Sequence, residues 1–259
     1  MLILLPPSEG KSRPAGTRRY NPDSLSHPEL ATARDQVLTE LQQVSAEPDA
    51  TRHLGVGASL AEQVAANTTL HRAPAAPAAQ VYSGVLYEAS GLARLSGTAR
   101  RRANISVRII SALWGVLRPD DRIPAYRLSM TTPLPSLPKL AAFWARHLSG
   151  VLDPDGSDVV VDCRSGAYAP AWSPPPEREW LTVRVVALRN GKPQVVSHHA
   201  KHARGVLVGH LLHRPEPLPR TVGQVRAAAE QLVGTSAREV RVHPAAGKGP
   251  DVLEIVLAD

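Results

Sequence analysis

The sequence predicts a mixed α/β (α+β) fold, in which helices cover a central mixed sheet within a single compact domain spanning residues 1–259. Short apolar runs of strand length alternate with segments of helical periodicity. A chain of 259 residues with 43% hydrophobic and 20% charged residues can bury a large core. No internal repeat divides the chain, and the Pro- and Ala-rich stretch 73–80 is too short to be a domain linker.

Each predicted element depends on a local pattern. Residues 1–5 are an apolar run broken by Pro6-Pro7, as expected of a buried strand. Asn190-Gly191 predicts a hairpin turn, and Thr221 with Gln224 predicts a capping box. The predicted strands are 1–5, 106–113, 158–162, 181–188, 193–197, 240–242 and 252–257, and the predicted helices are 28–44, 59–67, 137–148, 221–232 and one that starts near residue 200.

Composition excludes several classes of protein. No segment reaches the roughly 18 apolar residues of a membrane span, and the run 1–5 is too short for a signal peptide, so we expect a cytoplasmic protein without membrane contact. The single cysteine, Cys163, excludes an intrachain disulfide and a cysteine-based zinc site, and its place beside a predicted strand favours an inert buried thiol.

The positive charge is concentrated in the middle of the chain. The formal net charge is +7, and the segment 94–127 holds eight arginines against Asp120 and Asp121. Such a segment could neutralise several phosphates of a polyanion, although scattered surface arginines are also common in arginine-rich sequences.

Polar side chains follow or adjoin the predicted strands. Lys201 and Arg204 lie on one face of a helix start, beside an apolar stripe of Ala203, Leu207 and Leu211, and this arrangement suits a phosphate or carboxylate. If the strand ends converge, these groups form one basic cleft. The candidate anion-binding residues are Ser8, Lys11, Arg118, Tyr126, Arg127, Ser165, Tyr168, Lys201 and Arg204.

Two better-known sites do not fit. The Gly10-Lys11-Ser12 ending resembles a phosphate-binding loop, but Leu5 occupies the position of the required first glycine. His198 and His202 are four residues apart, but no carboxylate follows at motif distance, so we predict neither a metal site nor a cofactor.

Several motifs together resemble one family. They are the N-terminal segment 1–11 (MLILLPPSEGK), Val81-Tyr82-Ser83-Gly84, the segment 114–119 (WGVLRP) with 124–128 (PAYRL), Phe143-Trp144, and the segment 200–205 (AKHARG). On these residues the chain resembles the YaaA family, also called UPF0246 or DUF328, over nearly its whole length.

The resemblance implies a role in resistance to hydrogen peroxide that limits iron-dependent damage. It also implies a single domain of unusual fold with a helix-hairpin-helix-like element, and a positively charged cleft that binds duplex or branched DNA. By similarity the hairpin would fall near residues 114–119, with Arg118 and Arg127 in the cleft beside Lys201 and Arg204. This chain has only Gly115 where such a hairpin normally has a Gly-x-Gly turn.

An enzyme acting on a small phosphate- or carboxylate-bearing molecule, such as a nucleoside or nucleotide, is the alternative. Tyrosine, serine and aspartate groups beside the cations are typical of a small-molecule site. In that case Lys11 or Lys201 would be the base or nucleophile, and Arg118 and Arg204 would hold the substrate anion. The sequence leaves both alternatives open, with DNA or a small anionic ligand as the partner.

Overall fold

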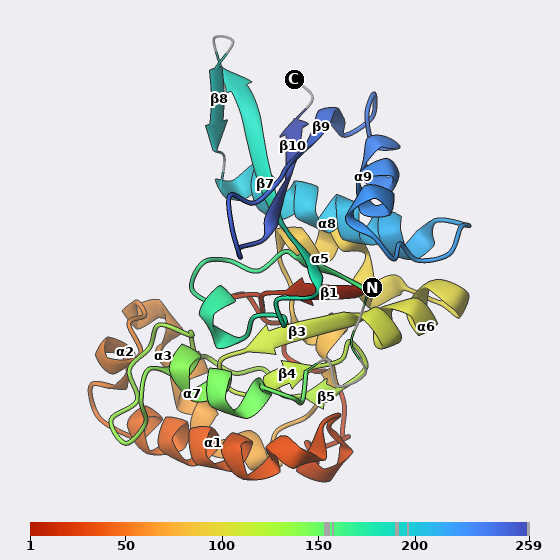
Figure 1. The fold of residues 1–259 in the computed structure, drawn as a ribbon. Helices are drawn as coiled ribbons and strands as arrows, with labels where there is room; N and C mark the ends of the chain where they lie inside the picture. The colour runs from red at the N-terminus through yellow and green to blue at the C-terminus, as the bar shows by residue number, and fades with distance from the viewer. Residues whose placement is uncertain (153–155, 157, 190–191, 196, 258–259) are drawn as a thin grey trace.

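The computed structural model describes residues 1–152, 156, 158–189, 192–195 and 197–257. Within these residues, one sheet of eight strands runs in the order β4-β3-β1-β6-β7-β10-β9, with β8 paired to β7 (Figure 1). The strands are β1 (Leu2–Leu5), β3 (Val107–Ser111), β4 (Gly115–Leu117), β6 (Val159–Asp162), β7 (Glu179–Arg189), β8 (Lys192–Val195), β9 (Ala237–His243) and β10 (Asp251–Leu257), and β2 (Ala76–Pro77) pairs separately with β5 (Arg122–Ile123). The predicted mixed α/β fold is confirmed.

The strand β1 lies inside the parallel part of the sheet, which runs β3-β1-β6-β7-β10. It pairs in parallel with β3 on one side and with β6 on the other, and β6 continues in parallel to β7. All four residues of β1 are buried, as expected of a parallel strand covered on both faces. The carboxyl ends of β1, β3 and β6 therefore meet at one edge of the sheet, where open α/β sheets bind ligands.

Helices surround the sheet. In Figure 1, α8 crosses behind β7, α1 lies below β4, and α2 and α3 lie at the left, on the side toward which the arrows of β1 and β3 point. The helices are α1 (Ala31–Ser45), α2 (Ala50–His53), α3 (Ala61–Ala66), α4 (Ala78–Val81), α5 (Val85–Ser90), α6 (Gly97–Ser106), α7 (Leu140–Leu148), α8 (Ser197–His213) and α9 (Val222–Glu230). In the part of the chain that the structure describes, no helix is long and apolar enough to cross a membrane.

The helix α8 follows the sequence pattern closely. Its predicted apolar stripe of Ala203, Leu207 and Leu211 is buried. It packs on α5 through Gly205, where an added Cβ would lie 2.4 Å from the carbonyl oxygen of Leu86. A glycine is needed at this position because the two backbones approach too closely for any side chain.

The expected helix-hairpin-helix near residues 114–119 is wrong. Residues 115–117 form β4, which pairs antiparallel with β3. Trp114 is fully buried, and Gly115 has a φ of +69° with the ring of Trp144 against its Cα. This segment is part of the core and offers no exposed hairpin to a phosphate backbone.

Most of the other predicted elements are confirmed, with boundaries shifted by a few residues. Thr221 caps α9 by accepting a hydrogen bond from the Gln224 amide at 3.2 Å. The predicted turn at Asn190-Gly191 lies outside the described residues. Burial raises the pKa of Cys163 to about 12, which makes its thiol unreactive, as expected.

Candidate functional site

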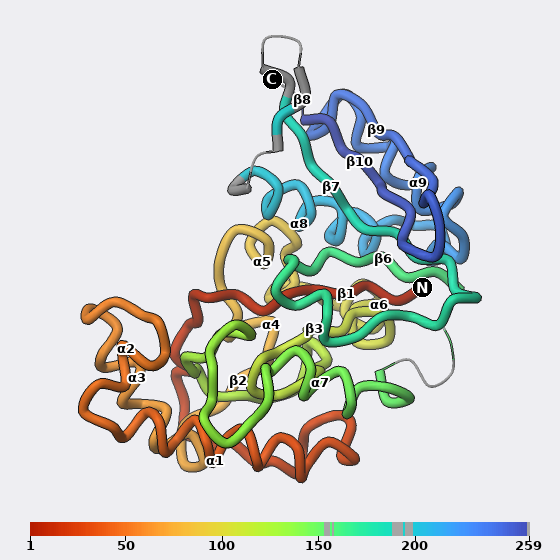
Figure 2. The backbone as a smooth tube through the Cα atoms, turned by 60° about the vertical axis from the view of Figure 1, so that its left-hand side comes forward, coloured from red at the N-terminus to blue at the C-terminus, as the bar shows by residue number. Residues whose placement is uncertain are grey.

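The loop after β1 is fixed in place by residues 81–83. The Ser12 amide donates to the Val81 carbonyl at 2.8 Å, and the Ser83 amide donates to the Gly10 carbonyl at 3.2 Å. The Ser8 hydroxyl donates to the Ser83 carbonyl. Two of the motifs that carry the family resemblance therefore lie side by side, and Lys11 bridges to Tyr82 between them. Figure 2 shows the backbone that continues from β1 and leads into this loop.

Lys11 is the centre of the site. Its Nζ donates to the carbonyls of Ser8, at 2.7 Å, and Glu9, at 3.4 Å. It also lies over the ring of Tyr126, 4.4 Å from the centroid, and 5.6 Å from the centroid of the Tyr82 ring. Within the described residues, no carboxylate oxygen lies within salt-bridge distance of this nitrogen.

Burial changes the protonation of Lys11. Burial, and after it the charge of the nearby Arg127 guanidinium, lower the pKa of the amine from 10.5 to about 7 against the opposing effect of Glu9. Carbonyl oxygens and aromatic faces favour the charged form, but they do not replace the water that an exposed ammonium would hold. Near neutral pH a large share of Lys11 is therefore an uncharged amine.

Buried hydroxyl groups form the wall behind Lys11. The Tyr126 hydroxyl is hydrogen-bonded to the Tyr82 hydroxyl at 2.9 Å and to Ser111 Oγ at 2.8 Å, with Ser111 at the carboxyl end of β3. Burial raises the pKa of both tyrosines well above their ordinary value. These phenols stay neutral, so they give Lys11 an aromatic surface with no counter-charge.

Arg127 is held beside Lys11 from two directions. Its backbone amide donates to Asn67 Oδ1 and its carbonyl accepts from Asn67 Nδ2, both at 2.9 Å. Its guanidinium donates to the Glu9 carbonyl at 2.7 Å and to the Gln63 side chain. The cation is thus oriented, and none of the carboxylates among the described residues forms a salt bridge with it.

Two cavities meet at Lys11. The larger, of about 700 Å³, is lined by both apolar and charged residues. The smaller, of about 520 Å³, is lined by hydroxyl, backbone and charged groups. The larger is lined by Lys11, Arg13, Pro14, Glu62, Gln63, Ala66, Thr69, Leu70, Arg72, Ala73, Pro74, Ala125 and Tyr126, and the smaller by Ser8, Glu9, Lys11, His53, Leu54, Gly55, Val56, Gly57, Leu60, Arg127, Leu128, Ser129, Thr131, Thr132, Pro133 and Tyr168.

Tyr168 reaches the smaller cavity from the loop after β6. The loop is fixed by a buried bidentate pair, in which Arg164 Nε and NH2 donate to the Asp162 carboxylate at 2.9 and 2.7 Å. Arg164 also donates to the carbonyls of Tyr168 and Trp172. Asp162 is therefore committed to loop structure, and the Tyr168 hydroxyl, which accepts from the Met130 amide at 3.4 Å, faces the site.

The structure brings together five of the predicted residues and separates four. Ser8, Lys11, Tyr126, Arg127 and Tyr168 line the two cavities, whereas Arg118, Ser165, Lys201 and Arg204 do not. Arg118, Ser165 and Lys201 are exposed elsewhere, and both Nε and NH2 of Arg204 donate to the Val183 carbonyl, at 3.0 and 2.7 Å. The nine residues therefore do not form the single basic cleft expected from the strand ends, and of the predicted cations Lys11 and Arg127 line the two cavities.

Sequence reasoning missed several residues of this site. Tyr82 lies in a recognised motif, but nothing local shows that its hydroxyl meets Tyr126. Asn67 and Gln63 lie on or beside α3, and only the tertiary fold places them at Arg127. One local pattern could have indicated part of the site. Asp162 and Arg164 are two residues apart at the end of a strand, a spacing that allows the ion pair that fixes the Tyr168 loop.

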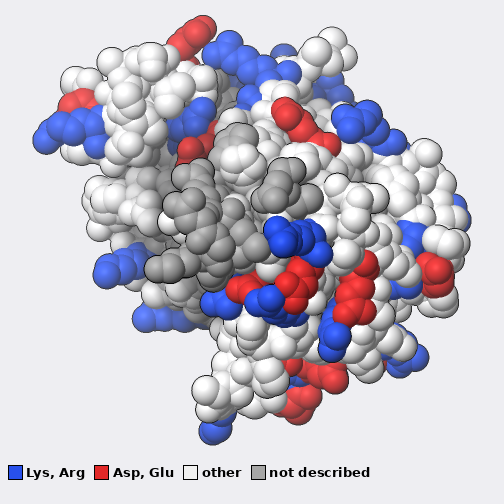
Figure 3. All heavy atoms as spheres, turned by 90° about the horizontal axis from the view of Figure 1, so that it is seen from above, with Lys and Arg blue, Asp and Glu red and all other residues white. Residues whose placement is uncertain are grey.

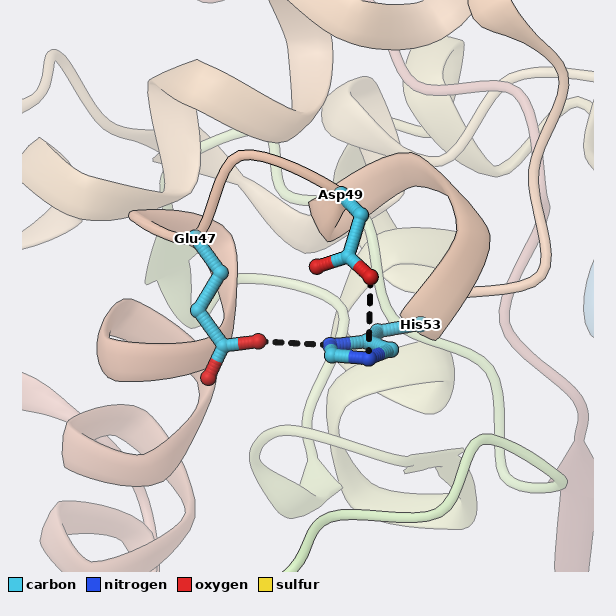
Figure 4. Close-up of side chains that lie close together, drawn as sticks. All are labelled: Glu47, Asp49 and His53. Carbon is cyan, nitrogen blue, oxygen red and sulfur yellow. Dashed lines mark ion pairs between the residues drawn. The ribbon is translucent and has the colours of Figure 1, made fainter.

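A second polar cluster lies at the edge of the smaller cavity (Figure 4). His53 Nδ1 is 2.6 Å from a Glu47 carboxylate oxygen, and its Nε2 is 3.5 Å from Asp49. The two carboxylates therefore contact different ring nitrogens, whereas a metal ion would need them to converge with one nitrogen. Asp49 also pairs with Arg52. These contacts describe an ion-pair network at the mouth of the cavity.

The fold and the site define a mixed α/β protein with a lysine-centred pair of cavities at the carboxyl ends of parallel strands. The family model described as peroxide stress protein YaaA matches residues 1–226, and the chain belongs to this family. It is 44% identical over 215 residues to a UPF0246 protein of Streptomyces coelicolor (82% of this chain, 83% of the relative). It is 39% identical over 230 residues to one of Corynebacterium efficiens (87% and 90%) and 38% identical over 212 residues to one of Corynebacterium glutamicum (80% and 83%).

Proposed function

We propose that this peroxide stress protein binds a small phosphate- or carboxylate-bearing molecule at Lys11 and Arg127, and acts on it there. The observation that carries the proposal is the position of Lys11, an amine with no carboxylate partner in the described structure, in the wall between two cavities. Cavities of this size suit a molecule of nucleotide dimensions. An anion would supply the counter-charge that the protein does not provide.

Calorimetric titration with adenosine monophosphate and ribose 5-phosphate tests this proposal. A charge-assisted hydrogen bond contributes about 1.5–3 kcal/mol, so Lys11→Met should weaken binding by roughly 10- to 100-fold. Lys201→Met is the matched control, because Lys201 is an exposed lysine outside both cavities, and it should leave the affinity unchanged. Equal affinities of the wild type and Lys11→Met for every anion that binds would contradict the proposal.

Binding of duplex or branched DNA is the second candidate. It is supported by the net charge of +7 and by exposed cations such as Arg118 and Lys201. Most arginines of the 94–127 segment, however, have partners within the protein. Arg100 pairs with Asp120, and Arg102, Arg108, Arg122 and Arg127 donate to backbone carbonyls. On the face seen in Figure 3, acidic and basic side chains are interspersed.

Fluorescent duplex and four-way-junction DNA, titrated across a salt series, test the DNA candidate. Affinity that falls steeply with salt, and weakens in an Arg118→Ala/Lys201→Ala variant, would support it. Arg204 is left intact because its guanidinium donates to the Val183 carbonyl in β7. Its removal would disturb the fold and would not measure DNA contact. Weak binding that does not depend on salt would contradict the DNA candidate.

A further inference from the structure

The Lys11 amine has the surroundings of a nucleophile. It lies at the carboxyl end of β1, against the neutral rings of Tyr126 and Tyr82, and it is accessible from both cavities. A lysine is activated for nucleophilic attack when an apolar pocket and a neighbouring cation disfavour its charged form. Here the tyrosine rings provide the pocket and Arg127 provides the cation.

The two cavities differ in chemistry. The larger has proline, alanine and leucine side chains and the Tyr126 ring on its wall, and Arg13, which pairs with Glu62 at 3.6 Å, and Arg72 also line it. The smaller is bordered by Arg127, Tyr168 and the hydroxyl side chains of Ser129, Thr131 and Thr132. A ligand with an apolar or planar body and an anionic end would fit across both of them. Its central atoms would then lie next to Lys11, which lines both cavities.

We propose that Lys11 forms an imine with the carbonyl group of an aldehyde or ketone that also carries a phosphate or carboxylate. This inference rests on the proposed function, because the anion would be held by Arg127 in the smaller cavity. Among small anions, those that carry an aldehyde or ketone group would then bind covalently, and the others would bind only through their charge.

The step is balanced without any oxidant or reductant. The lone pair of neutral Lys11 Nζ attacks the carbonyl carbon, the C–N bond forms, and the π electrons move to the oxygen. A proton passes from nitrogen to that oxygen to give a carbinolamine. Loss of the hydroxyl group with the second nitrogen proton, as water, leaves the C=N bond. Tyr168 lines the same cavity, together with Ser129, Thr131 and Thr132, and hydroxyl groups of this kind can donate a proton to the departing water.

The Lys11 loop is fixed well enough for such a reaction. Residues 8–12 are held to residues 81–83 by backbone hydrogen bonds, and the amine itself is oriented by the Ser8 carbonyl at 2.7 Å. Lys201, the other lysine considered from sequence, is exposed on α8 and lines neither cavity. Lys11 is thus distinguished from it by enclosure and by orientation.

Reductive trapping tests the proposal on the full-length protein. The protein is incubated at pH 7 with pyridoxal 5′-phosphate, used as a reagent that carries an aldehyde and a phosphate, then treated with cyanoborohydride and mapped by mass spectrometry. About half of an amine with a pKa of 7 is neutral at this pH, against roughly one part in 2,500 at an ordinary lysine pKa near 10.4. We expect Lys11 to be labelled at least about tenfold faster than Lys201 in the same sample.

The controls separate this proposal from the proposed function. Lys11→Arg keeps the charge but cannot form an imine, so it should lose the label at position 11, and Lys201→Arg should leave that label unchanged. Pyridoxal without the phosphate should label Lys11 more slowly, and adenosine monophosphate should protect it. Labelling of Lys11 no faster than Lys201 would overturn the imine proposal, even if calorimetry shows anion binding. A different result would be equally fast labelling of Lys11 by pyridoxal with and without the phosphate, and without protection by adenosine monophosphate. That result would overturn the anion site and would still support Lys11 as a nucleophile.

Discussion

Replacing Lys11 with methionine should stabilise the protein below neutral pH, by an amount that shrinks as the pH rises. In the folded protein the pKa of Lys11 is about 7, whereas in the unfolded chain it takes its ordinary value of 10.5. Between these two values the unfolded chain binds more protons, so the stability of the wild type rises with pH across that window. Below pH 7 the penalty for holding the buried ammonium is present in full, and the methionine variant lacks it.

The magnitude follows from the size of the pKa change. A fall from 10.5 to about 7, at about 1.4 kcal/mol per pH decade, sets an upper bound of about 5 kcal/mol. Lys11 is partly exposed, and the carbonyl of Ser8 and the face of Tyr126 compensate part of the desolvation. We therefore expect a difference of about 2–3 kcal/mol at pH 6 that falls between pH 7 and pH 10.5 and becomes constant only above that window.

Urea denaturation of both proteins at intervals from pH 6 to pH 10 measures this difference. Other titrating groups are common to the two proteins and cancel, and the hydrogen bonds that methionine loses contribute an offset that does not vary with pH. Lys201→Met, which removes an exposed lysine outside both cavities, serves as the control. A flat profile for Lys11→Met would refute the reasoning about burial.

Three further substitutions test Arg127, the packing of α8 on α5, and the buried ion pair of Asp162. Arg127→Gln should raise the pKa of Lys11, since the guanidinium disfavours the ammonium, and should weaken adenosine monophosphate binding; nuclear magnetic resonance and calorimetry measure the two effects. Gly205→Ala should destabilise the protein by about 1–3 kcal/mol, because its Cβ would meet the Leu86 carbonyl oxygen at 2.4 Å; a loss of less than 0.5 kcal/mol in urea denaturation would contradict this packing. Asp162→Asn should cost about 3–5 kcal/mol by leaving a buried guanidinium without its carboxylate, and an unchanged thermal midpoint would contradict that.

The strands of the central sheet could be predicted from local sequence because buried strands are visible as short runs of apolar residues. Residues 2–5 are a continuous apolar run that only a strand covered on both faces can bury, and the prolines that follow fix its end. Two helices, α5 and α6, have no comparable apolar pattern in the sequence. In α6 (Gly97–Ser106) only Ala103 and Ser106 are buried, so the apolar periodicity that indicates a helix is missing, and α5 (Val85–Ser90) is too short to show one.

The site could be predicted only where it follows a strand directly. Lys11 follows β1 within six residues, so its position at the edge of the sheet could be read from the sequence. Lys201 and Arg204 depend instead on how α8 packs on α5, and the contact that decides it, between Gly205 and the Leu86 carbonyl, joins residues more than a hundred positions apart. The same long-range packing turns Arg204 toward β7 and away from the cavities.

The most direct test of the account is the protonation of Lys11 itself. The Cε–Hε signals of the five lysines in protein labelled with ¹³C-lysine can be followed from pH 5 to pH 11, with Lys11→Arg identifying the Lys11 signal. The account predicts a titration midpoint near pH 7 that moves upward when inorganic phosphate binds, because an anion stabilises the ammonium. A midpoint near 10.5 that phosphate does not change would contradict both the buried amine and the anion site built around it.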